Sequence, residues 1–119
     1  MSVYSYLRVS TQQQQKDDGY QKSQILEYAN ENKLGSVEFI EDVVSGAKDW
    51  KKRKIGQLVN DMNENDILLV NEFSRLGRSL LDILDILKSL KEKGCVVHIV
   101  RDKMVIADNI NSKLMVFMF

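Results

Sequence analysis

The sequence predicts an α/β fold: a mostly parallel central sheet of about four to five strands, flanked by helices. Short apolar runs typical of buried strands alternate along the chain with longer stretches in which apolar residues recur every three or four positions. Parallel strands need crossover helices of this kind, and their right-handed connections leave few topologies. A chain of 119 residues fits one domain with a core of its own.

The strands are predicted from apolar runs bounded by polar or glycine-containing segments. The run from Ile67 to Val70 is unbroken, which indicates a strand buried on both faces. In chain order, the strands are expected at 3–9, 37–40, 67–70, 96–100 and, as a short addition, 104–106.

The helices are predicted from apolar periodicity and from residues suited to helix ends. Gly35 and Gly94 are expected to end two of them, and Ser79 to cap a third, with Asp82 three residues later. The first helix has an apolar stripe of Ile25, Leu26, Ala29 and Leu34. The helices are expected at about 16–33, 53–63, 79–93 and from 109 onward, with a loop over 47–54.

Composition excludes several kinds of protein. The charges of 17 basic and 17 acidic residues cancel. A DNA-binding protein that acts alone usually carries a positive excess, so the composition argues against strong DNA binding by this chain by itself. The single cysteine, Cys95, excludes an internal disulfide and a cysteine-based zinc site, and we expect it in the core. His98 is expected to be a core or edge histidine rather than a metal ligand. Without a membrane-length apolar run or a signal-peptide pattern, we expect no membrane association and a cytoplasmic location.

Polar residues follow three predicted strands at the point where each ends. Ser10 ends the first, Asp42 to Ser45 end the second, and Ser74 to Arg78 follow the third. Ligands of open parallel sheets bind outside the carboxyl ends of the strands. We therefore expect these residues to converge on one rim.

Arginines are the residues of this rim that could bind an anion. Arg8 and Ser10 share one face of the first strand, and Arg53, Arg75 and Arg78 come from later loops. Guanidinium groups bind phosphate oxygens and could stabilise a phosphoryl transition state without a metal. The alternative interpretation is surface charges paired with acids. For Arg53 alone, this alternative is as good as phosphate binding. For the glycine-containing loop from Arg75 to Arg78, phosphate binding is the better interpretation.

Three motifs carry a resemblance to a known family. They cover essentially the whole chain in order, and they resemble the catalytic domain of serine recombinases, the resolvase/invertase family. Its small bacterial resolvases and DNA invertases, found on mobile elements, are the most similar members. The motifs are Tyr6-Leu7-Arg8-Val9-Ser10-Thr11, Asp42 with Ser45-Gly46, and Ser74-Arg75-Leu76-Gly77-Arg78-Ser79.

The resemblance implies site-specific DNA recombination through a covalent 5′-phosphoserine link at Ser10, with no cofactor or metal. The residues implied around the scissile phosphate are Arg8, Arg75, Arg78 and, from the basic loop, Arg53. Asp42 matches an acid that positions arginines or assists proton transfer, although it could also be a structural cap or pair. Gln24 matches a helix glutamine near the site. Ser74 departs from the family, which has an acid at this position.

The resemblance also implies that the apolar run 114–119 is the start of a long dimerisation helix. We then expect residues 1–119 to be a catalytic domain truncated within that helix, with a DNA-binding domain beyond it. The expected partners are DNA and a second copy, with a tetramer as the active synaptic state. Alternatively, the run is the last core helix.

Two alternative functions are open to an α/β domain of this kind. A phosphatase or nucleotide-dependent transferase would need a signature that is missing here. A non-catalytic, DNA-associated regulatory module of recombinase-like fold is the second alternative. The presence of Arg8, Ser10, Arg75 and Arg78 argues against it.

Overall fold

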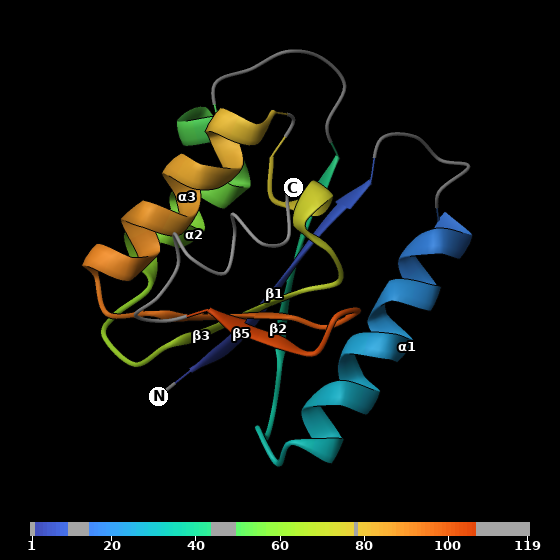
Figure 1. The fold of residues 1–119 in the computed structure, drawn as a ribbon. Helices are drawn as coiled ribbons and strands as arrows, with labels where there is room; N and C mark the ends of the chain where they lie inside the picture. Colours follow the sequence, from blue (N-terminus) through green and yellow to red (C-terminus); the bar gives the residue numbers. More distant parts are fainter. Residues whose placement is uncertain (1, 10–14, 44–49, 78, 107–119) are drawn as a thin grey trace.

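A five-stranded sheet forms the centre of the fold in a computed structural model that describes residues 2–9, 15–43, 50–77 and 79–106 (Figure 1). The spatial order is β2-β1-β3-β4-β5. Pairing is parallel from β2 through β4, and β5 joins β4 antiparallel, which confirms the predicted mostly parallel sheet. The strands are β1 (Val3–Val9), β2 (Glu38–Val43), β3 (Ile67–Val70), β4 (Val96–Ile99) and β5 (Met104–Ile106).

Helices cover both faces of the sheet (Figure 1). The first face packs on α1 (Gln15–Glu31), and the second on α2 (Lys54–Asp61) and α3 (Leu80–Glu92). Two short 3₁₀ turns, η2 (Trp50–Lys52) and η3 (Phe73–Arg75), precede α2 and α3. Alternation along β1 divides its side chains: Leu7 joins the α1 core, while Tyr6 joins the core under α2 and α3.

Several elements fall where the sequence places them. The strand at 67–70 is confirmed residue for residue, with all four side chains buried. Ser79 caps α3, since its hydroxyl accepts a hydrogen bond of 3.2 Å from the amide of Asp82. Cys95 is buried, and His98 is a buried strand residue whose Nδ1 lies 2.6 Å from the Tyr28 hydroxyl.

The end of α1 differs from the prediction. The helix ends at Glu31, and Lys33 beyond it adopts a left-handed conformation (φ 55°). Gly35 (φ 86°) is therefore the second left-handed residue after the helix and not the helix end. Leu26 is 50% exposed, while Tyr28 takes a place in the core. Ile25 and Ala29 are buried as predicted, so the stripe differs from the prediction only in that Tyr28 is buried and Leu26 is not.

The second crossover also differs. β2 runs past its predicted end because pairing with β1 continues through Arg8–Asp42 and Val9–Val43. Asp42 thus lies within the strand rather than in the loop after it. The expected loop ends in η2, and Arg53 has extended backbone (φ −97°, ψ 175°), so α2 begins one residue later than predicted.

The predicted helix from 109 lies outside the described residues. Within the part of the chain that the structure describes, no helix is both long and apolar enough to cross a membrane.

Candidate functional site

Arg8 and Asp42 lie opposite each other at the carboxyl ends of β1 and β2. Register partners in a parallel sheet share a face, and both side chains are on the face covered by α2 and α3, as Tyr6 and Ile40 show by joining that core. Arg8 is half-buried and Asp42 is buried. A cation and an acid therefore occupy neighbouring positions at the predicted rim.

Tyr6 fixes the acid of this pair. Its hydroxyl donates a buried hydrogen bond of 2.7 Å to Oδ2 of Asp42. Burial, followed by the Asp42 hydrogen bond and charge, raises the pKa of Tyr6 far above its usual value of 10. The phenol consequently stays a proton donor at all working pH values and holds the carboxylate in one orientation.

Arg53 approaches the same point from the start of α2. Its positive charge and that of Arg8 both act to lower the pKa of Tyr6, in opposition to burial and Asp42. Arg53 is only 8% exposed, and its Nε and Nη1 are buried with no hydrogen-bond partner among the described residues. A buried guanidinium with unused donors is a place that an anion could fill.

The η2 turn carries Arg53 to this position. Trp50 is buried, and its indole Nε1 donates to Oδ2 of Asp85 on α3 at 3.0 Å. The Arg53 amide then donates to the Trp50 carbonyl at 3.1 Å. Gly56 permits the close packing of η2 on α2, since a Cβ there would lie 2.4 Å from the Lys51 carbonyl oxygen.

Arg75 reaches the rim from η3, which follows β3 and contacts β1. Its Nε lies 3.7 Å from Oε1 of Glu72, and the Ser74 hydroxyl donates to the same oxygen at 2.8 Å. The other oxygen, Oε2, lies 2.6 Å from Nη1 of Arg101. The Ser74 hydrogen bond, the Arg101 hydrogen bond and the two positive charges lower the pKa of Glu72 against the effect of burial. Sequence reasoning missed Glu72.

Two glutamines of α1, Gln21 and Gln24, lie on the other face of the sheet. Gln24 accepts a hydrogen bond of 2.7 Å from Asn71, at the end of β3, and donates one of 2.8 Å to the Tyr20 hydroxyl. Its contact with phosphate stays a prediction. Gln21, which was not predicted, is 2% exposed, and both of its amide atoms lack a hydrogen-bond partner within the described ranges. The sequence did hold a signal for its burial, because Gln21 lies four residues before Ile25 and so falls on the same face of the helix.

Two predicted site residues, Ser10 and Arg78, lie outside the described residues. The structure brings Arg8, Asp42 and Arg53 together around Tyr6, and it places Arg75 on the turn that contacts β1. Figure 1 shows the ends of β1 and β2 and the η3 turn on the same side of the molecule.

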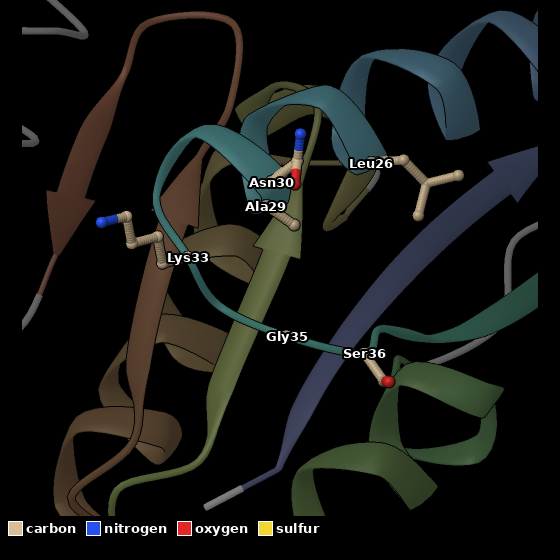
Figure 2. Close-up of a pocket in the computed structure, with 6 residues that line it drawn as sticks. All are labelled: Leu26, Ala29, Asn30, Lys33, Gly35 and Ser36. Atoms are coloured by element: carbon tan, nitrogen blue, oxygen red, sulfur yellow. The ribbon is translucent and has the colours of Figure 1, made fainter.

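A surface hollow lies elsewhere, at the turn that leads from α1 into β2 (Figure 2). This turn precedes the amino end of β2, whereas Asp42 is near the carboxyl end of the same strand. The hollow and Asp42 therefore lie at opposite ends of β2. Lys33 is the one charged residue of its lining, and its side chain points away from that of Leu26 in Figure 2. The hollow is separate from the arginine rim.

The sequence profile of one family, described as "Resolvase, N terminal domain", matches residues 3–119. The chain belongs to this family. A resolvase of Clostridium perfringens is 25% identical over 100 residues, which are 84% of this chain and 49% of that protein. The transposon Tn1546 resolvase of Enterococcus faecium is 26% identical over 103 residues, 86% of this chain and 49% of that protein. The chain thus spans about half the length of these curated relatives.

Two solved structures share the fold. The N-terminal catalytic domain of TP901-1 integrase superposes with a TM-score of 0.69 at 22% identity, over 99% of this chain and 91% of that one. A resolvase family site-specific recombinase from Streptococcus pneumoniae gives a TM-score of 0.62 at 24% identity, over 99% and 82% of the two chains. These likenesses establish the resolvase-type catalytic fold that the motifs predict.

Proposed function

We propose that this resolvase-family domain is the catalytic domain of a serine site-specific recombinase, which cuts and rejoins DNA without a cofactor or metal. The observation that carries the proposal is the buried guanidinium of Arg53. Among the described residues its Nε and Nη1 have no hydrogen-bond partner, and the same rim holds Arg8 and Asp42. Arg8 is two positions before Ser10 in the sequence. A phosphodiester would supply an anion for the unpartnered donors of Arg53.

The proposed reaction is an exchange of phosphate esters. The Oγ of Ser10 attacks the phosphorus, its bond to phosphorus forms, and the bond from phosphorus to the 3′ oxygen breaks. The serine proton leaves as the 3′ oxygen gains one, so the products are a 5′-phosphoserine link and a 3′-hydroxyl. Attack by a 3′-hydroxyl on the phosphoserine reverses the step and rejoins DNA.

Arginines supply the electrostatic part of this step. Arg8, Arg53, Arg75 and Arg78 are proposed to bind the non-bridging oxygens and to stabilise the charge that develops on the phosphoryl group. Asp42, held by Tyr6, is proposed to orient Arg8, its register neighbour. Gln24 is proposed to contact the DNA phosphate from the α1 side.

DNA and further copies of the chain are the proposed partners, as a homodimer that pairs into an active tetramer. The zero net charge supports a division of labour in which a separate DNA-binding domain provides most of the affinity. We propose that this domain follows a dimerisation helix that begins near the end of the 119 residues, and that the protein works in the cytoplasm.

The test is a covalent adduct between the full-length protein and DNA that carries its own recombination site. The adduct is expected with the wild type and absent with Ser10→Ala. Ser23→Ala, which removes an exposed serine of α1, is the matched control and should leave the adduct unchanged. An adduct that persists in a folded Ser10→Ala protein would contradict the mechanism, and a wild type that forms none would favour the regulatory alternative.

A further inference from the structure

Glu72 connects two arginines through its two different carboxylate oxygens. Oε1 lies 3.7 Å from Nε of Arg75, and Oε2 lies 2.6 Å from Nη1 of Arg101. Arg75 belongs to the rim, whereas Arg101 lies in the turn between β4 and β5. The carboxylate therefore bridges η3, which carries Arg75, and the turn between β4 and β5, which carries Arg101.

We propose that Glu72 is a positioning residue, which sets the orientation of the Arg75 guanidinium and anchors it to the β4–β5 turn. This inference rests on the proposed function, because it assigns a partner to an arginine of that site. Glu72 itself is not proposed to touch DNA.

Hydrogen bonds hold the chain around this bridge. The Ser74 hydroxyl donates to Oε1 of Glu72 at 2.8 Å, and the Arg75 amide donates to the Glu72 carbonyl at 3.1 Å. On the other side, the Arg101 amide donates to the Asn71 carbonyl at 2.9 Å. The backbone at both ends of the bridge is thus held by hydrogen bonds, while the Arg101 side chain is 65% exposed.

A carboxylate at Nε suits a positioning role. The guanidinium is planar, so a contact at Nε restrains the plane in which its other nitrogens lie. Bidentate recognition of phosphate depends on that plane. At 3.7 Å the contact is an ion pair and longer than a hydrogen bond, so Glu72 attracts the guanidinium of Arg75 through charge.

A positioning role and simple electrostatics predict opposite results. Loss of a negative charge beside Arg75 should, by charge alone, leave DNA binding unchanged or make it tighter, and should not slow cleavage. If Glu72 orients Arg75, its neutralisation should slow the chemical step even though DNA binding is retained. Comparison of affinity with cleavage rate separates the two.

The decisive variant is Glu72→Gln in the full-length protein, which keeps the size of the side chain and removes its charge. On DNA with the recombination site, we expect unchanged or tighter binding and a fall of roughly 10-fold or more in the rate of adduct formation. Glu92→Gln, at the opposite end of α3 from the rim, removes the same charge and should change neither. An adduct rate for Glu72→Gln within about twofold of wild type would overturn the inference.

A second variant distinguishes lost orientation from lost folding. Because the Ser74 hydroxyl lies against Oε1 of Glu72, an aspartate at position 74 would bring a carboxylate close to the same place. Glu72→Gln/Ser74→Asp should recover part of the lost rate, with a thermal midpoint no higher than that of Glu72→Gln. A rate that follows the thermal midpoint across these variants would indicate a purely structural role and overturn the inference.

A measurement independent of DNA keeps this inference separate from the proposed function. The ¹⁵N NMR signal of the Arg75 Nε–H group reports its order and its exchange with water. In the 119-residue chain, we expect Glu72→Gln to make this group more mobile and faster to exchange, while Glu92→Gln leaves it unchanged. If Arg75 keeps its order in Glu72→Gln, the inference fails even where recombination succeeds. If wild-type adducts are absent, the proposed function fails while this contact can still be verified.

Discussion

The Tyr6 hydroxyl donates a 2.7 Å hydrogen bond to Oδ2 of Asp42, which joins β1 to β2 at the rim where Arg8 and Arg53 gather. The bond is buried, so neither partner can be replaced by water without cost. This bond holds the Asp42 carboxyl at the same rim as the two arginines. The relationship links the packing of the core to the geometry of the site.

Loss of this hydrogen bond should impair both stability and cleavage. Tyr6→Phe removes only the hydroxyl and leaves a buried oxygen of Asp42 without its donor, so the free energy of unfolding should fall by roughly 1 to 3 kcal/mol. Adduct formation should slow by at least about 10-fold. Chemical unfolding and a timed adduct assay measure the two effects. Tyr4→Phe, on the same face of β1, is the control, and an equal loss in that variant would count against a specific role for Tyr6.

Arg53 should show the opposite relation between stability and activity. Its buried guanidinium lacks partners for Nε and Nη1 within the described residues, so Arg53→Met removes a desolvated charge. The free energy of unfolding should stay the same or rise by about 1 kcal/mol, while adduct formation is lost. Urea unfolding beside the adduct assay tests this, with exposed Lys52→Met as the control. Marked destabilisation of Arg53→Met would show that this arginine is a structural partner instead.

Two glycines should respond to alanine in opposite directions. Gly56→Ala would place a Cβ 2.4 Å from the backbone oxygen of Lys51, so the turn must shift, at a cost of roughly 1 to 3 kcal/mol. Gly19 lies in α1 with nothing within 4 Å of the new Cβ, and Gly19→Ala should stabilise by about 0.5 to 1 kcal/mol. Thermal unfolding of both variants measures the pair. Equal tolerance at the two sites would contradict the close packing of η2 on α2.

His98 should make stability fall in mild acid. Burial lowers the pKa of His98 below its ordinary 6.5, so the folded state holds it neutral, with the Tyr28 hydroxyl at Nδ1. The resulting stability is fully present above pH 6.5, the unfolded value, and is lost as the pH falls toward the lower folded value. Urea unfolding at pH 7.5 and 5.5 should show this loss, and His98→Asn should reduce it. An identical pH dependence in His98→Asn would assign the loss to other groups.

Local patterns predicted the framework well. The apolar run 67–70 and the Ser79 cap were found because each is determined by neighbouring residues. The neighbouring positions of Arg8 and Asp42 could also be predicted, because the carboxyl ends of parallel strands meet at the same rim of the sheet. What local patterns could not provide were contacts between distant residues. Tyr6 meets Asp42 across 36 positions, and Arg101 meets Glu72 across 29.

The direct test of the central claim is the identity of the amino acid that becomes linked to DNA. After adduct formation by the full-length protein, nuclease and trypsin should release the peptide from Val9 to Lys16, since trypsin cleaves after Arg8 and Lys16. Fragmentation in a mass spectrometer should place a 5′-phosphonucleotide on Ser10. A nucleotide on Thr11 or on any residue outside this peptide would contradict the assignment of Ser10 as the nucleophile.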